Sequence, residues 1–170
     1  APTPPLAWSV LGDMDTPLSL QRAALTGIDQ MADPGFAAAI APHLSGEVLG
    51  AFILDHKNTV QGLRACFGLA QAQGLALDFH VDEGLGDLNG LEAIADMALE
   101  TRFDGPILCG HAVGLMDKGA QDFARIADKC AAAGLTICAL PTTNLYLQGR
   151  TGGTPDRRGL TRLAELRAAG

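Results

Sequence analysis

Two patterns of apolar and polar residues alternate along the chain. Short, continuously apolar runs such as Ile107-Leu-Cys109 are typical of parallel strands covered by helices. Longer blocks with apolar residues three or four positions apart predict helices. The expected strands are Leu18–Leu25, Val48–Leu54, Leu75–Phe79, Pro106–Cys109 and Leu135–Leu140. The expected helices are Pro34–His43, Thr59–Gln73, Leu91–Arg102, Gly119–Ala133 and Leu160–Ala169.

The block at 59–73 gives the clearest helix signal. Asn58 stands at the expected N-cap and Gly74 at the expected stop. The apolar face is predicted to consist of Val60, Leu63, Cys66, Phe67 and Ala70.

The order of these blocks predicts an α/β protein. Successive strands start about 30 residues apart, the length of a strand, a helix and their loops, so the strands should be parallel and joined by right-handed crossovers. Five such strands standing alone would leave two open edges, which complete barrels avoid. The pattern therefore favours either a flavodoxin-like open sheet or the middle of a larger (β/α) barrel.

Candidate chemistry gathers where the third and fourth expected strands end. Leu75-Ala-Leu-Asp-Phe leads into His80, followed by Asp82 and Glu83, and Pro106-Ile-Leu-Cys-Gly leads into His111. In a (β/α) barrel the residues at the C-terminal ends of the strands carry the chemistry. Two histidines and a carboxylate at this edge predict a hydrolytic metal site.

Composition and charge narrow the function classes. The 170 residues carry a net charge of −7, which disfavours nucleic acid or an anionic membrane as a partner. No apolar run is long enough to span a bilayer, and the first five residues lack the basic and apolar regions of a signal peptide. The four cysteines have no metal-binding spacing, so we expect buried thiols in a reducing, cytoplasmic setting.

Two loops and one further histidine are also candidates. The glycine-rich stretch Gly84–Gly90 has the spacing G-x-G-x-x-x-G rather than that of a dinucleotide fingerprint, and the acidic residues Asp82, Glu83 and Asp87 would repel a pyrophosphate. The stretch 141–158 is expected to be irregular, with Asn144, Gln148 and Arg150 directed at a site or, alternatively, at solvent. His56 follows an expected strand end and is predicted to line the pocket or to be exposed to solvent rather than to bind metal.

With these pieces in place, the chain resembles the cytosine deaminase branch of the metal-dependent amidohydrolase superfamily over roughly residues 45 to 170. The matching blocks are Asp78-Phe-His-Val-Asp-Glu83, Gly110-His111, Leu140-Pro141 with Asn144, Leu147-Gln-Gly-Arg150 and Arg157-Arg-Gly-Leu-Thr-Arg162. The resemblance implies that residues 1–170 form the central part, about strands 3–7, of a single barrel domain.

Site roles also follow from the resemblance. It implies one divalent metal ion, Zn or Fe, with His80 as one of its ligands. Glu83 would be the proton-shuttling acid and base, and His111 would contact the attacking hydroxide and the substrate. Thr26, Asn144, Gln148 and His56 are the expected substrate contacts. The expected partner is a small heterocycle, and the full-length protein is expected to form a homo-oligomer.

The resemblance leaves the substrate open. Cytosine deaminases carry a Pro-Gln pair at the end of the third barrel strand, whereas Leu20–Thr26 holds no such pair, and Thr26 lies nearest that position. The expected reaction is hydrolysis of a C–N bond in a cyclic amidine such as an aminopyrimidine, aminopurine or aminotriazine. Hydrolysis of an alkylaminotriazine or a cyclic amide is the alternative, and a flavodoxin-like binding module without catalysis is the alternative from another class.

Overall fold

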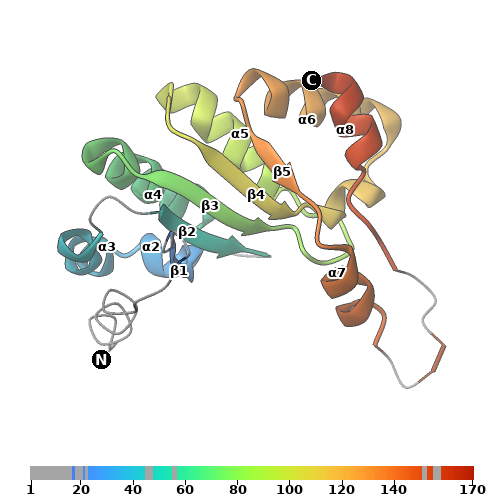
Figure 1. Ribbon diagram of the computed structural model, residues 1–170, viewed down its shortest axis with the longest axis horizontal. Coiled ribbons are helices and arrows are strands. Elements are labelled where there is room, and N and C mark those ends of the chain that lie inside the picture. Colours follow the sequence, from blue (N-terminus) through green and yellow to red (C-terminus); the bar gives the residue numbers. More distant parts are fainter. Residues whose placement is uncertain are drawn as a thin grey trace.

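The structure is a computed structural model that describes residues 17, 21, 23–44, 48–54, 57–150, 153–154 and 158–170. Its centre is a five-stranded parallel sheet in the order β1-β2-β3-β4-β5. The strands are β1 (Ala23–Gly27), β2 (Val48–Ile53), β3 (Ala76–Val81), β4 (Ile107–His111) and β5 (Thr136–Cys138). Each strand therefore pairs with the next one along the chain (Figure 1).

The helices between the strands form a single layer. The chain passes through α2 (Ile28–Met31), α3 (Pro34–Ile40), η1 (Ala41–His43), α4 (Thr59–Gln73), α5 (Gly90–Thr101), η2 (Val113–Asp117) and α6 (Ala120–Ala132), and ends with α7 (Pro141–Leu147) and α8 (Leu163–Ala169). Neighbouring helices pack in chain order, α2 on α4, α4 on α5 and α5 on α6 (Figure 1). A flavodoxin-like sheet would reverse its strand order once and carry helices on both faces. The observed order is instead that of a barrel, and the open-sheet alternative is wrong.

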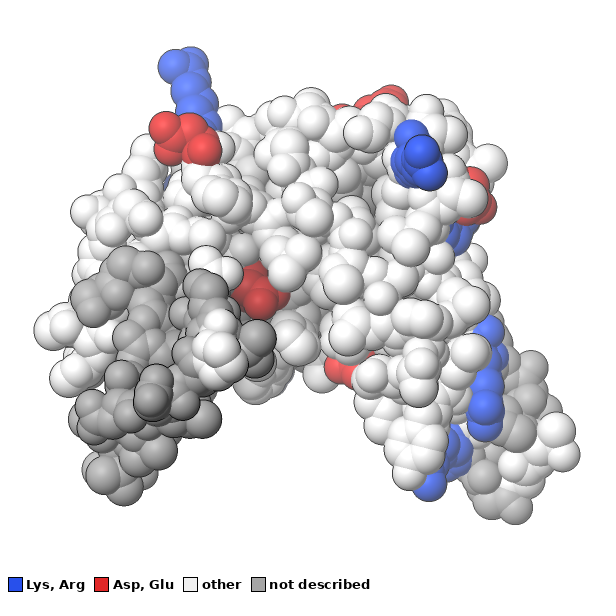
Figure 2. All heavy atoms as spheres, in the orientation of Figure 1, with Lys and Arg blue, Asp and Glu red and all other residues white. Residues whose placement is uncertain are grey.

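Alternation along the strands separates a covered face from an open one. Residues facing the helix layer are fully buried, among them Leu49, Ala51, Leu77, Phe79 and Cys109. Residues between them stay accessible, with Leu25 at 47%, Phe52 at 42% and Leu108 at 37% exposure. Figure 2 shows few charged side chains on the side of the molecule that it presents. The core therefore lies between the sheet and its helices, while the other face of the sheet has no covering layer among the described residues.

Most of the predicted elements are confirmed. Helix α4 runs from Thr59 to Gln73 as predicted, and Gly74 ends it in the left-handed conformation with φ of 65°. The expected apolar face was wrong at one position, because Val60 in the first turn is 60% exposed. The buried face of α4 begins at Gly62, where the helix meets α2.

Three expectations are corrected. The first strand was placed too early, since β1 covers Ala23–Gly27 rather than Leu18–Leu25. The stretch after Leu140 was expected to be irregular, but its first seven residues form helix α7, with Pro141 in the first turn, where a proline costs no hydrogen bond. Cys138 is exposed, whereas the other three cysteines are buried as expected.

None of the helices in the described part of the chain has the length and apolar character needed to cross a bilayer.

Candidate active site

The ends of β3 and β4 bring two histidines together. The parallel register pairs His80 with Gly110 and Val81 with His111, so the two imidazoles come from adjacent strands. Their ring centroids lie 5.2 Å apart, and Nε2 of His111 lies 3.4 Å from Nδ1 of His80. Glu83, two residues beyond the end of β3, places a carboxylate oxygen 3.8 Å from Nδ1 of His111. The three residues singled out in the sequence thus form one cluster.

His111 is held in place from both its backbone and its ring. Its φ of 73° is left-handed, an unusual conformation for a residue with a side chain. The hydroxyl of Thr161 donates a hydrogen bond to its carbonyl oxygen. On the ring, Nδ1 and the side-chain amide of Asn144 share a hydrogen bond of 3.1 Å, while Nε2 faces His80.

Burial keeps His111 neutral. The ring is only 3% exposed, and burial lowers the pKa of His111 below its ordinary value. The Glu83 carboxylate acts in the opposite direction, while the charge of a protonated His80 would lower the pKa further. A neutral imidazole at pH 7 can donate one hydrogen bond and accept another, or bind a metal ion.

Asp82 anchors the turn between His80 and Glu83. Its side chain is 2% exposed, and its two carboxylate oxygens accept hydrogen bonds from the backbone N–H groups of Gly90 and Leu91, each at 2.9 Å. These N–H groups belong to the first turn of α5 and lack partners within the helix. Asp82 therefore ties the end of β3 to the start of α5, and its φ of 48° turns the chain so that Glu83 leaves the strand direction.

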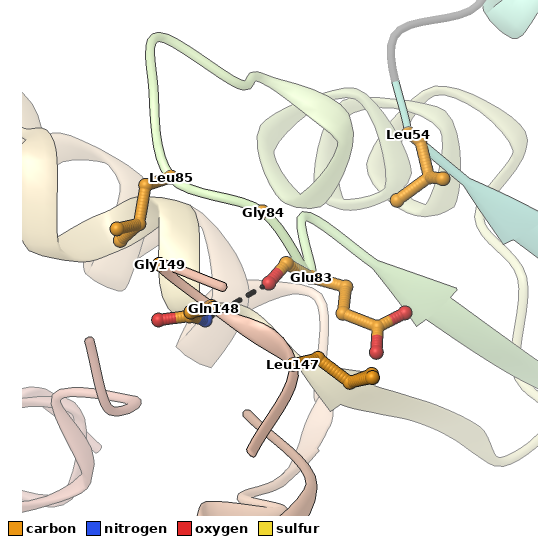
Figure 3. Close-up of a pocket in the computed structure, with 7 residues that line it drawn as sticks. All are labelled: Leu54, Glu83, Gly84, Leu85, Leu147, Gln148 and Gly149. Atoms are coloured by element: carbon orange, nitrogen blue, oxygen red, sulfur yellow. Dashed lines mark hydrogen bonds between the residues drawn. The ribbon is translucent and has the colours of Figure 1, made fainter. Parts of the chain in front are cut away.

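Glu83 lines an adjoining pocket of about 390 Å³. The walls are formed by Leu54, Gly84, Leu85, Leu147, Gln148 and Gly149. In Figure 3 the Glu83 carboxylate points between Leu54 and Leu147 and away from Gln148. A carboxylate at the mouth of a mainly apolar pocket, beside two imidazoles, can transfer protons to and from a bound ligand.

The residues expected to contact the substrate differ in where their side chains lie relative to the cluster of His80, Glu83 and His111. Asn144 and Gln148 are buried, at 1% and 8% exposure, and their amides contact the ring of His111 and the backbone of Glu83, respectively. Thr26 lies on β1 on the same face as Ala24, which packs against the core, so its side chain is directed toward the helix layer and away from His80. His56 lies outside the described residues.

A metal ion would need ligands in addition to this cluster. Among the described residues no group of three His, Cys, Asp or Glu side chains is arranged to hold a metal. The donors that are present suit one, because imidazole nitrogen and carboxylate oxygen are common ligands of Zn and Fe.

Sequence reasoning gave no role to Asp82 or Thr161, although both fall in the quoted blocks. Local spacing did not mark Asp82, because its partners Gly90 and Leu91 lie eight and nine residues further along the chain, whereas a capping Asp stands directly before its helix. Thr161 had no local signal, because its hydrogen bond to His111 joins residues 50 positions apart.

Comparison with known proteins finds similarity to deaminases. No protein-family model matches the chain. A pterin deaminase from Rhizobium rhizogenes (strain K84 / ATCC BAA-868) is 37% identical over 157 residues, which cover 90% of this chain and 36% of that protein. Crystal structures of 5-methylcytosine deaminase from Klebsiella pneumoniae match at 26% identity, the one liganded with phosphonocytosine with a TM-score of 0.76 over 89% of this chain and 38% of that chain.

A third match shows the fold alone. N-isopropylammelide isopropylaminohydrolase from Burkholderia multivorans ATCC 17616 is 21% identical, with a TM-score of 0.64 over 88% of this chain and 36% of that one. The chain thus spans little more than a third of the length of the relatives it matches. In sequence and in fold it is similar to the deaminases of the cytosine deaminase-like branch of the amidohydrolase superfamily, as its motifs predicted, with its five strands matching part of their barrel.

Proposed function

We propose that the protein containing this chain is a hydrolytic deaminase that replaces an exocyclic amine of a cyclic amidine by oxygen. The observation that carries the proposal is the convergence of His80, Glu83 and His111 beside one pocket. The 37% identity to a pterin deaminase supports it independently. In this reaction water adds to the ring carbon, the carbon–nitrogen bond breaks, and ammonia leaves.

Glu83 is the residue placed to move the protons. The attacking water must lose both of its protons, one to the ring nitrogen and one to the departing amine, as its oxygen becomes the carbonyl oxygen of the product. A single carboxylate can make these transfers if it reaches both the water and the ring. Glu83 has this freedom, because its carboxylate extends into the pocket while its backbone is held (Figure 3). His111 is placed to donate a hydrogen bond from Nε2 to the oxygen that develops negative charge.

A divalent ion would be held by His80 together with ligands from beyond this cluster, and His111 is close enough to be its immediate neighbour. When bound, such an ion lowers the pKa of water to about 7 and so supplies hydroxide at neutral pH. The residues of this chain then supply the proton transfers and the position of the substrate. The identity of the ion, Zn or Fe, belongs to the same proposal.

For the substrate we propose a planar aminated heterocycle, with a pterin first and an aminopyrimidine such as 5-methylcytosine second. One relative in sequence is a pterin deaminase. The position where cytosine deaminases carry a glutamine falls at Thr26, which faces the helix layer here. The pocket walls formed by Leu54, Leu85 and Leu147 suit the faces of a flat ring. Barrel closure by residues outside 1–170, homo-oligomer formation and a cytoplasmic location stay predictions.

Ammonia release by the complete protein tests this function. The substrates are a pterin, cytosine, 5-methylcytosine and an N-alkylaminotriazine, each supplied with the protein loaded with Zn or Fe. We expect ammonia from the pterin or a pyrimidine, and we expect Glu83→Gln to lower kcat by several orders of magnitude with metal content unchanged. Glu100→Gln is the matched control, since Glu100 is exposed and pairs with Arg64 on the helix layer.

Two results would contradict the proposal. Near-wild-type turnover by Glu83→Gln would remove Glu83 from the chemistry. Release of an alkylamine from the triazine, with no ammonia from any aminated ring, would assign the protein to the alternative alkylaminotriazine hydrolysis.

A further inference from the structure

The side chain of Gln148 joins two segments behind the pocket. Its NH₂ group donates to the backbone carbonyl of Glu83 at 3.1 Å, and its carbonyl oxygen accepts from the backbone N–H of Gly159 at 2.6 Å. The side chain is 8% exposed and follows directly after α7. One amide thus connects the end of β3, the end of α7 and the segment that leads to α8.

The direction of the amide separates Gln148 from the substrate. In Figure 3 the Gln148 amide and the Glu83 carboxylate lie on opposite sides of the Glu83 backbone. Both polar atoms of the amide already have backbone partners. A glutamine that recognised the ligand would instead keep at least one of them directed into the pocket.

The segment that Gln148 holds is itself closely fitted to the site. A Cβ atom on Gly159 would lie 2.6 Å from the sulfur of Met116 and 2.8 Å from side-chain carbons of Leu85 and Val113, so this position accepts only glycine without a shift. Two residues later, Thr161 donates its hydrogen bond to the carbonyl of His111. The same short segment therefore supports the backbones of both Glu83 and His111.

We infer that Gln148 is a positioning residue that fixes the Glu83 backbone so that its carboxylate reaches the reacting ring. The inference rests on the proposed function and deepens it. Glu83 lies beyond the last residue of β3 and precedes Gly84, so the sheet alone does not fix its backbone. A displacement of about 1 Å in a catalytic group can cost about a hundredfold in rate.

Gln148→Glu tests this role in the complete protein. The glutamate keeps the shape of the side chain and the acceptor for Gly159 but removes the donor to the Glu83 carbonyl. We expect kcat for the best substrate to fall about 10- to 100-fold, while KM changes less than about threefold because the polar atoms of the amide bind backbone groups rather than the ligand. Gln148→Met, which is neutral, should show the same pattern. Gln121→Glu, on the exposed face of α6, is the matched control and should keep wild-type values.

The split between kcat and KM decides the outcome. A rise in KM with kcat unchanged would show that Gln148 binds the ligand and would overturn the inference, as would wild-type values for both Gln148 variants. Should Gln148→Met fail to fold, Gln148→Glu still gives the comparison, because it retains the bond to Gly159. Inactivity of the wild-type protein with every substrate would instead refute the proposed function, which is a separate result.

Discussion

Replacing Asp82 with asparagine tests how the turn that carries Glu83 is anchored. The two oxygens of Asp82 accept the backbone N–H groups of Gly90 and Leu91, each at 2.9 Å, and the side chain is 2% exposed. An asparagine has only one oxygen, so one buried N–H group loses its acceptor and faces an NH₂ group instead. Leaving such a group unsatisfied costs about 1–3 kcal/mol.

The expected loss is about 2 kcal/mol, because removing a buried charge returns part of its desolvation energy. With a denaturation slope of about 2–3 kcal/mol per molar urea, the midpoint should fall by roughly 0.7–1 M. The assay is urea unfolding of the complete protein followed by circular dichroism. Asp87→Asn is the matched control, since Asp87 lies on the same loop with its side chain 89% exposed, so that loss of its surface ion pair with Lys118 should leave the midpoint near the wild-type value.

The difference in stability between the wild-type protein and Asp82→Asn should depend on pH. Burial raises the pKa of Asp82 above its ordinary value, against the opposing effect of the hydrogen bonds from Leu91 and Gly90. The folded state therefore binds a proton more tightly than the unfolded state does, and wild-type stability rises relative to Asp82→Asn as pH falls from 7 through the folded pKa toward about 4. Equal midpoints for the Asp82 and Asp87 variants at pH 7 would refute the anchoring role of Asp82. A stability difference between wild type and Asp82→Asn that narrows on acidification would refute it as well.

Two further predictions concern the helix layer. A Cβ atom at Gly62 would lie 2.2 Å from the backbone oxygen of Ile28, so Gly62→Ala should destabilise the protein by about 1–3 kcal/mol. Nothing lies within 4 Å of a Cβ atom at Gly68 in the same helix, so Gly68→Ala should stabilise the protein by up to about 1 kcal/mol. Thermal unfolding of both variants measures the difference, and a stabilising Gly62→Ala would contradict the close packing of α4 on α2. Burial raises the pKa of Cys66 to about 12 and of Cys130 to about 11, so neither thiol should be alkylated in the native protein at pH 8, as peptide mass spectrometry would show, and modification of either before urea is added would contradict their burial.

The helices and strands were predictable where one local pattern determined them. Helix α4 was found to the residue, because its apolar spacing ends at a glycine that adopts the left-handed conformation. Helix α7 was missed, because Pro141-Thr-Thr is also typical of a turn and seven residues give too little periodicity to distinguish the two. The exposure of Val60 depends on where α2 crosses α4, which no local pattern contains.

In the candidate site, too, the residues set by the strand pattern were predictable, whereas the contacts set by tertiary packing were not. His80, Glu83 and His111 were predictable because parallel strands end at one edge of the sheet, and a histidine at each end must then be a neighbour. The partners of Asn144 and Gln148 were not, because they depend on how α7 lies beneath that edge. Thr26 shows how sensitive such reasoning is to register, since one residue along a strand changes the face on which a side chain lies.

Diffraction from crystals of the complete protein, recorded at the absorption edges of zinc and iron, tests the central claim most directly. We expect one anomalous peak bonded to His80, with His111 and the Glu83 carboxylate as its immediate neighbours. A metal ion bound elsewhere in the protein, with His80 and His111 bonded only to each other, would contradict it.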